Sequence, residues 1–455
     1  MKAKTNERGN FGSKLGIVLA TAGSAVGLGN VWRFPYMTGE NGGAAFLLLY
    51  IVCIFVLGVP GMLSEFIVGR HAQTNAVRAY GKLSGSKSWK FVGYLGILSS
   101  TIILGFYAVV AGWCLQYLLA SIGGQVNGDA NYVKTYFQDF STNPIKPVLW
   151  GVYFILVTQW VVVRGVRGGI ERASKMLMPI LLILLVVLVV ASCLLPGATE
   201  GIRFLLQPDF SKITSNVMLE AMGQAFFSLS LGTACLCTYA SYYDRSVNLL
   251  NAAGQIALLD TIIAILAGLV IFPAAASVGV SPDSGPSLIF ITLPNVFQQA
   301  FGAVPAIGYV VSVMFYALLV FAALTSTISL HEIGTAFFTE EFHLQRRHSS
   351  WIVTVVASVI CVFCSLSVGA FSNFKLMGLP IMEFCDQLTA NIMLPLGGML
   401  TCLFVGWFVP KQLVHDEFTN QGTVGTRLFG IFIFAVRYVC PIGIMIIFLH
   451  QLGVL

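Results

Sequence analysis

Charge is scarce in this sequence. Only 10% of its 455 residues are Asp, Glu, Lys or Arg, whereas soluble domains carry about 25%. Apolar residues make up 57% of the chain, and its mean hydropathy is +0.84. Apolar runs of about 20 residues recur, as in membrane-spanning helices, and the shorter alternation typical of β-barrels is missing. The composition excludes a soluble globular protein and predicts an all-α polytopic membrane protein.

Several other signals are also missing. The amino end, MKAKTNERGN, is polar and the first apolar segment is interrupted, so no cleavable signal peptide is expected. The ten cysteines are scattered through apolar segments, and Cys235-x-Cys237 has neither a zinc nor a redox spacing. No HExxH or paired-aspartate motif accompanies His331 and Glu332, which argues against an intramembrane enzyme. No linker or low-complexity tract interrupts residues 1–455, which are predicted to form a single domain.

The apolar runs predict eleven spans, at about 12–36, 42–70, 90–122, 148–165, 168–195, 216–243, 250–277, 304–338, 350–368, 376–409 and 426–450. Most of the 25 Lys and Arg residues fall in the loops of one side, and the loops of the other side hold only Lys134, Lys146, Arg203, Lys212 and Lys375. Because cytoplasmic loops are enriched in Lys and Arg, the amino end is predicted to be cytoplasmic and the carboxyl end to lie outside. The same asymmetry explains the net charge of +6 without a nucleic-acid partner.

Two predicted spans contain residues that disfavour a continuous helix. The first span includes the stretch GSAVGLGN at 23–30, whose three glycines each cost about 1 kcal/mol relative to alanine in a helix. The sixth span places Ser228, Ser230, Gly232 and Thr233 inside an apolar run. Lipid cannot satisfy the backbone groups that a break exposes, so a break persists only where it lines a polar cavity or meets a ligand. For the first stretch, a glycine-rich helix packed closely on a neighbour is the alternative.

The chemistry of such breaks favours transport. Freed carbonyls suit a hard cation, and the amides that start the second half-helix suit a carboxylate. Interrupted spans at corresponding positions of two halves are typical of transporters built from inverted repeats. Here the repeats are predicted at about 12–195 and 216–409, followed by an extra helix at about 426–450.

Several long motifs resemble those of the neurotransmitter:sodium symporter family. They are GSAVGLGNVWRFPY at 23–36, ENGGAAF at 40–46, GVPGMLSEFIVGR at 58–70, SLSLG and TYASY within 228–242, and ALTS at 323–326. The likeness covers nearly the whole chain and is nearest to bacterial members that carry several hydrophobic amino acids. It implies the LeuT fold, a 5+5 inverted repeat with broken helices 1 and 6. It also implies sodium symport by alternating access in a bacterial cell membrane.

The resemblance implies two sodium sites made of oxygen ligands. The first matches Ala25, Asn30, Ser228 and Asp260, and the second matches Gly23, Val26, Ala322, Thr325 and Ser326. Chloride-requiring members carry Asn where this chain has Asp260. An isolated Asp in a bilayer is costly, so Asp260 is predicted to bind sodium and to replace chloride as the fixed negative charge. The alternatives are a protonated Asp260 hydrogen-bonded inside the bundle, and a Thr-Ser pair that only joins helices.

The implied substrate is an amino acid. Its carboxylate is expected at the amides of Leu28 and Gly29 and the hydroxyl of Tyr107, because Gly27 stands where monoamine symporters carry an Asp. Its amino group is expected near the carbonyls of Ala25, Phe227 and Ser230. The implied side-chain pocket consists of Ile103, Phe227, Thr233, Thr327 and Leu330. Thr233 replaces a Phe found in a relative with a tighter pocket, so aromatic as well as aliphatic side chains are expected to fit.

The resemblance also implies gates. Arg33 and Asp386 are expected to form the outer pair, with Phe227 and Tyr107 as a lid. The inner pair is expected between Arg8 and Glu340 near Tyr242, with Glu341 as the alternative acid and Phe11 as a plug. Gly169 and Pro179 are expected to permit unwinding of span five, the alternative being a static kink. Another zwitterion as substrate and a sodium-conducting channel remain the alternative functions.

Overall fold

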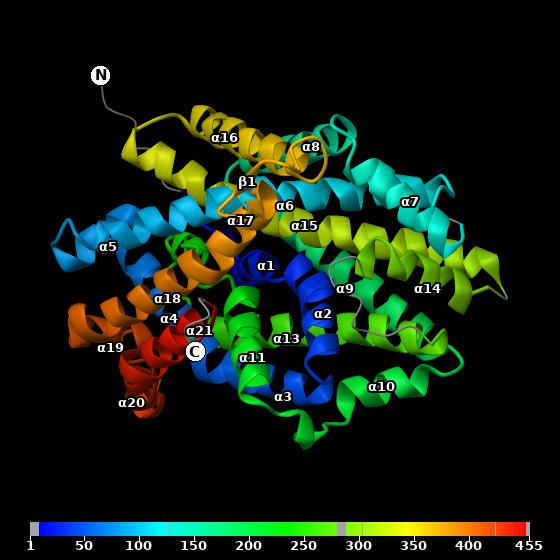
Figure 1. The fold of residues 1–455 in the computed structure, drawn as a ribbon. Helices are drawn as coiled ribbons and strands as arrows, with labels where there is room; N and C mark the ends of the chain where they lie inside the picture. Colours follow the sequence, from blue (N-terminus) through cyan, green and yellow to red (C-terminus); the bar gives the residue numbers. More distant parts are fainter. Residues whose placement is uncertain (1–8, 127, 280–287, 303, 424, 452–455) are drawn as a thin grey trace.

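The computed structural model describes residues 9–126, 128–279, 288–302, 304–423 and 425–451 as a bundle of helices (Figure 1). Within these residues, eight helices are long and apolar enough to cross a membrane, or up to ten if each of two bent pairs is one span. The predicted count of eleven is therefore not confirmed. The missing element is the sixth predicted span, which consists of two short helices, α11 (Ser215–Ser228) and α12 (Cys235–Ala240).

The apolar spans form the body of the bundle. They are α3 (Ala44–Cys53) continuing through a π-helical turn (Ile54–Gly58) into α4 (Val59–Ala72), α6 (Lys90–Ile122), α8 (Lys146–Val162), a π-helical turn (Val166–Glu171) leading into α9 (Arg172–Cys193), α13 (Leu249–Ser277), α15 (Pro305–Glu341), α16 (Arg346–Ser367), α17 (Ile381–Gln387) with α18 (Leu394–Leu403), and α20 (Phe429–Phe434) with α21 (Cys440–Gln451). Figure 1 shows α6 and α15 crossing the bundle side by side, and these two helices are in extensive contact.

Shorter elements connect the spans. They are α5 (Ala76–Ser84), α7 (Ala130–Ser141), α10 (Ala198–Leu206), α14 (Thr292–Ala300), α19 (Lys411–Phe418), and the antiparallel strands β1 (Lys375–Leu376) and β2 (Leu379–Pro380). In the strand pair, Lys375 lies opposite Pro380. The β hairpin links α16 to α17 and so brings these two helices together.

The first span is broken where the glycines predicted it. Helix α1 (Lys14–Ala25) ends at Ala25, and Val26 adopts an extended backbone with ψ of 105°. The chain becomes helical again in a π-helical turn (Gly29–Arg33) that leads into α2 (Phe34–Glu40). The two halves are bent by 51°. Helix α1 packs against α9, α13 and α15, so the break lies inside the bundle.

The sixth span is broken as well. Between α11 and α12, the backbone turns through positive φ angles of 54° at Ser230, 80° at Gly232 and 61° at Ala234. Glu65 of α4 accepts hydrogen bonds from the amides of Gly232 at 2.8 Å and Cys237 at 3.2 Å. The buried carboxylate therefore satisfies amide groups that the break leaves without helical partners. Both predicted breaks are confirmed.

Candidate functional site

The two breaks meet at the centre of the bundle. The hydroxyl of Ser230 in the second break donates to the carbonyl of Ser24 in the first, at 3.1 Å. A cavity of about 60 Å³ lies beside this contact, large enough for several waters. Its walls include most of the residues expected to bind substrate: Ala25, Gly29, Ile103, Tyr107, Phe227, Ser230, Thr233 and Leu330. Leu28 lies just outside, on the wall of a larger cavity described below.

Thr327 is the exception in the expected pocket. It is fully buried but does not line the cavity. Its hydroxyl contacts the hydroxyl of Thr158 in α8 at 2.9 Å and donates to the carbonyl of Leu324 at 3.1 Å. Each residue turns the helix by about 100°, so Thr327 faces almost the opposite way from Thr325, whose hydroxyl contacts the carbonyl of Val26 in the first break. The prediction that Thr327 lines the pocket is wrong for this structure, and the residues of α15 that line the cavity are Ser326, Ser329 and Leu330.

Asp260 is the hub of the first expected sodium site. Its carboxylate is fully buried in α13 and accepts a hydrogen bond from Asn30 Nδ2 at 2.8 Å. The hydroxyl of Ser228 donates to both carboxylate oxygens, at 3.0 and 2.9 Å. The hydroxyl of Tyr50, from α3, donates at 2.9 Å. Three of the four expected ligands thus contact one another, and the fourth, Ala25, lines the adjacent cavity, as Ser228 does.

The second expected sodium site is assembled between α1 and α15. The Thr325 hydroxyl donates to the carbonyl of Val26 at 3.3 Å and to that of Ala322 at 2.9 Å. The Ser326 hydroxyl also donates to the Val26 carbonyl, at 3.4 Å. A Cβ atom added to Gly23 would lie 3.4 Å from Thr325 Cβ, so Gly23 borders the same cluster. All five residues converge, and their hydroxyl and carbonyl oxygens fit a hard cation.

The expected carboxylate site has its donors in place. The amide of Leu28 donates to the hydroxyl oxygen of Tyr107 at 2.9 Å. Gly27 allows this approach, because a Cβ atom there would lie 2.8 Å from the Tyr107 hydroxyl and 2.3 Å from Ser326 Oγ. In this structure, the Leu28 amide and the Tyr107 hydroxyl, which are both expected to bind the carboxylate, are hydrogen-bonded to each other. An anion placed here would accept from both groups.

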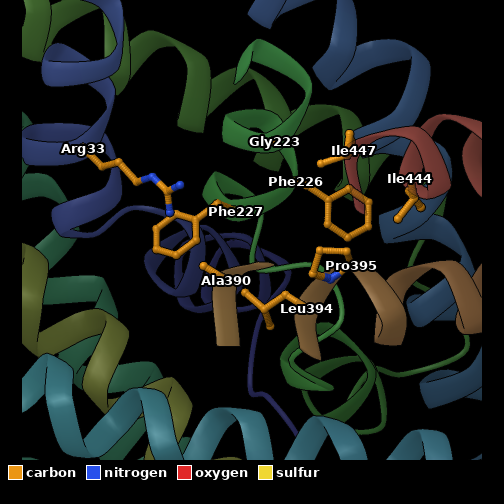
Figure 2. A pocket seen from close by; sticks show the side chains of 9 residues that line it. All are labelled: Arg33, Gly223, Phe226, Phe227, Ala390, Leu394, Pro395, Ile444 and Ile447. Atoms are coloured by element: carbon orange, nitrogen blue, oxygen red, sulfur yellow. The ribbon is translucent and has the colours of Figure 1, made fainter. Parts of the chain in front are cut away.

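A vestibule of about 720 Å³ opens above the central cavity, and its wall includes Arg33, Phe227 and Asp386. The guanidinium carbon of Arg33 lies 4.3 Å from the ring centroid of Phe227, a cation–π contact. Figure 2 shows this stacking, with Phe226 turned the other way toward Pro395 and Ile444. No ion pair joins Arg33 to Asp386 in the described residues. The expected outer pair shares one vestibule, but the salt bridge is not formed in this structure because Arg33 stacks on Phe227 instead.

The opposite end of α1 leads to the expected inner gate. The ring of Phe11 packs edge-on against two tyrosine rings, with its centroid 5.9 Å from that of Tyr239 and 6.2 Å from that of Tyr242. Glu340 accepts a hydrogen bond from the amide of Asn75, the amino-terminal cap of α5, at 2.6 Å. Glu341, the alternative acid, pairs with Arg78 at 2.7 Å. Arg8 lies outside the described residues, so its predicted pairing with Glu340 stays a prediction.

A buried ion pair beside this gate was not predicted from the sequence. Tyr242 donates its hydroxyl proton to Glu332 Oε1 at 2.7 Å, and the same carboxylate forms an ion pair with Arg346. Arg346 also donates to the carbonyl of Val162. An acid inside an apolar span requires a partner, and Arg346 at the start of the next span was the available signal. Tyr50, which bonds to Asp260, was also missed, since a tyrosine in a span carries no such signal.

The start of span five is helical and contacts the start of span one. Gly169 lies in the π-helical turn, where an added Cβ atom would come within 2.1 Å of the Val161 carbonyl. Pro179 lies inside α9. Glu171 accepts hydrogen bonds from the amide of Gly12 at 2.6 Å and the hydroxyl of Ser13 at 3.0 Å. The segment between Gly169 and Pro179 is not unwound here, and its unwinding stays a prediction.

The chain is similar to several known proteins over nearly its whole length. A profile of the sodium:neurotransmitter symporter family matches residues 8–136 and 138–454. An uncharacterized sodium-dependent transporter, YhdH of Bacillus subtilis, is 38% identical over 98% of both chains. A second, from Haemophilus influenzae, is 34% identical over 99% of this chain and 100% of the relative. The solved structure of MhsT in complex with L-phenylalanine is similar with a TM-score of 0.89, at 41% identity over 98% of this chain and 100% of that one.

Proposed function

Since this chain belongs to the sodium:neurotransmitter symporter family, whose members are secondary transporters and not enzymes, we propose that it imports hydrophobic L-amino acids with sodium. The convergence of both helix breaks on one small cavity carries the proposal. One member of each oxygen cluster lines this cavity: Ser228, which contacts Asp260, and Ser326, which shares the Val26 carbonyl with Thr325. Irregular backbone within a bundle is tolerated where it serves such a binding site.

Sodium is the coupling ion at two sites. At the first, Ala25, Asn30, Ser228 and Asp260 hold the ion. At the second, Gly23, Val26, Ala322, Thr325 and Ser326 hold it. The negative charge of Asp260 neutralises the first ion, so chloride is not required. Support for this role comes from the complete burial of Asp260 and its three side-chain donors, which stabilise a carboxylate.

The amino acid binds between the breaks. Its carboxylate takes the place of the contact between Leu28 and Tyr107 and accepts from both groups, while its amino group meets carbonyls near Ala25, Phe227 and Ser230. Gly27 supports an amino acid substrate, because no side chain could stand there without meeting Tyr107 and Ser326. Thr233 supplies space for aromatic side chains. That MhsT has been crystallised with L-phenylalanine supports an aromatic substrate.

Transport proceeds by alternating access. Sodium and amino acid enter through the vestibule, Arg33 and Phe227 close over them toward Asp386, and the gate around Phe11 then opens. Coupling requires that sodium bind the two states with different affinity. The transporter lies in the bacterial cell membrane with its amino end in the cytoplasm and its carboxyl end outside, as the Lys and Arg distribution favours. Reporter fusions at each end test this orientation.

The test is uptake of labelled tryptophan and leucine into proteoliposomes, with and without an inward sodium gradient and with chloride replaced by gluconate. We expect both amino acids to accumulate only with the gradient, and equally well in gluconate. Uptake of leucine that tryptophan and phenylalanine never inhibit would refute the wide pocket. Sodium flux without saturation or substrate coupling would instead favour the channel.

A further inference from the structure

Two cysteines from neighbouring helices lie together beside the vestibule. The sulfur of Cys364 in α16 is 4.0 Å from that of Cys385 in α17. Cys364 is buried and Cys385 is partly exposed. The described part of the chain contains all ten cysteines, and each is a free thiol. The pair therefore combines one accessible thiol with one protected thiol at contact distance.

Helix α17 forms part of the vestibule wall. Met382, Glu383 and Asp386 line the vestibule, so Cys385 directly precedes a wall residue. The beginning of α17 is fixed to α16, because Ser367 Oγ accepts a hydrogen bond from the amide of Met382 at 3.1 Å. The far end of α17 passes into a π-helical turn, Leu388–Met393, before α18 begins. A covalent bond at Cys385 would add a second attachment to α16, one turn closer to that π-helical turn.

We propose that Cys364 and Cys385 form a redox-reactive dithiol that a small disulfide entering the vestibule oxidises to an intramolecular disulfide, which tethers α17 and Asp386 to α16. A disulfide requires sulfurs about 2 Å apart, so the side chains must move together from their present separation. The neighbouring Cys361 does not compete for Cys385, because its sulfur faces Gly151 of α8, where an added Cβ atom would lie 2.6 Å away.

The reaction is thiol–disulfide exchange in two steps. The thiolate of Cys385, the more exposed residue, attacks the reagent, forming a mixed disulfide and releasing one reagent thiol. The thiolate of Cys364 then attacks the Cys385 sulfur and releases the second reagent thiol. The protein loses two electrons and two protons, and the reagent disulfide gains both as two thiols.

A second thiol pair provides an internal comparison. Cys402 of α18 and Cys440 of α21 also contact each other. Both are buried, whereas Cys385 is partly exposed, and neither is next in sequence to a vestibule residue as Cys385 is to Asp386. The Cys440 sulfur is 3.8 Å from the Leu57 carbonyl. If proximity alone decided oxidation, both pairs would react. If the vestibule must admit the reagent, only Cys364 and Cys385 react.

The test treats purified full-length protein with 4,4′-dithiodipyridine, followed by alkylation, digestion and mass spectrometry. Trypsin cleaves after Lys375, between the two cysteines, so a disulfide joins two otherwise separate peptides. We expect a linked pair that fragmentation assigns to Cys364 and Cys385. Cys364→Ser should stop at a mixed disulfide on Cys385, and Cys385→Ser should leave Cys364 unmodified. Recovery of wild-type Cys364 and Cys385 as thiols, or arrest at the mixed disulfide, would overturn the proposal.

The tether is tested by hydrogen–deuterium exchange, which is expected to slow in residues 381–393 of the oxidised wild type and to recover with reductant. Unchanged exchange there would overturn the tethering. A consequence for transport rests on the proposed function: oxidation should cause loss of most uptake in wild type and none in Cys385→Ser. Untreated protein that imports no amino acid would count against the proposed function only, because the linked peptide and the exchange are measured without transport.

Discussion

The side-chain amide of Asn30 donates to the carboxylate of Asp260 at 2.8 Å, joining the first helix break to α13. Asn30 and Asp260 are both fully buried. An ionised carboxylate is costly in such surroundings unless hydrogen bonds and an opposite charge compensate it. Asn30, Ser228 and Tyr50 supply the hydrogen bonds. A bound sodium ion would supply the opposite charge. We therefore expect Asp260 to carry its negative charge when sodium is bound.

Replacing Asp260 with Asn should make transport depend on chloride. The variant keeps the size and a hydrogen-bonding oxygen but loses the fixed negative charge, so an anion must neutralise the first sodium ion. In gluconate medium we expect uptake to fall by roughly tenfold, within the range typical of coupling between two binding sites, and to recover when chloride is added. Asp139→Asn changes an exposed carboxylate and serves as the control. Chloride stimulation of wild-type uptake would contradict the proposed role of Asp260.

Replacing Thr325 with Val should weaken sodium binding. The variant preserves the branched shape and removes the hydroxyl that contacts the carbonyls of Val26 and Ala322. Losing an interaction with a charged group costs about 1.5–3 kcal/mol, so the sodium concentration for half-maximal uptake should rise roughly tenfold to a hundredfold. Thr327→Val is the matched control, because that hydroxyl contacts Thr158 in α8. Equal shifts in both variants would indicate a general effect on α15.

A side chain at position 27 should abolish amino acid binding. In Gly27→Ala, the new methyl group would meet Ser326 Oγ at 2.3 Å and the Tyr107 hydroxyl at 2.8 Å. These contacts displace the group expected to bind the carboxylate, so binding should be lost while the protein stays folded. Gly254→Ala is the control, since nothing lies within 4 Å of its added Cβ atom. Scintillation proximity binding and thermal unfolding separate the two effects, and normal binding by Gly27→Ala would remove Gly27 from the site.

The fold and the two helix breaks could be predicted because their signals are local. Glycines at 23–29 and polar residues at 228–233 mark the breaks whatever the surrounding helices do. The rotation of α15 about its axis depends on the neighbouring helices, so the sequence predicts Thr327 in the pocket, whereas in the structure its hydroxyl contacts that of Thr158. The contact between Tyr50 and Asp260 likewise joins α3 to α13. Contacts between helices depend on how the helices pack together, and the local sequence pattern does not reveal that packing.

Gate contacts are harder to predict for another reason. A pair of residues that closes in one state is separated in another, so a single sequence pattern describes several arrangements. Arg33 stacks on Phe227 here and shares the vestibule with Asp386 without an ion pair between them. A weak contact suits a gate, and a cation–π contact at an exposed site contributes only about 0.5–1 kcal/mol.

Replacing Pro179 with Ala should slow the release of sodium and substrate to the cytoplasm. Pro179 lacks the amide that would bond within α9. The preceding Met178 lies near the proposed second sodium site, because its sulfur is 3.5 Å from a Cβ atom added at Gly23. Alanine restores the helical hydrogen bond and raises the free energy needed to unwind this segment, by up to about 3 kcal/mol. Sodium-dependent binding should persist in Pro179→Ala while the initial rate of uptake falls. Pro273→Ala removes a second intrahelical proline, from α13, and controls for the loss of a proline as such. If Pro179→Ala transports at the wild-type rate, the proline only bends the helix, and sodium must reach the cytoplasm by a route that does not require α9 to unwind.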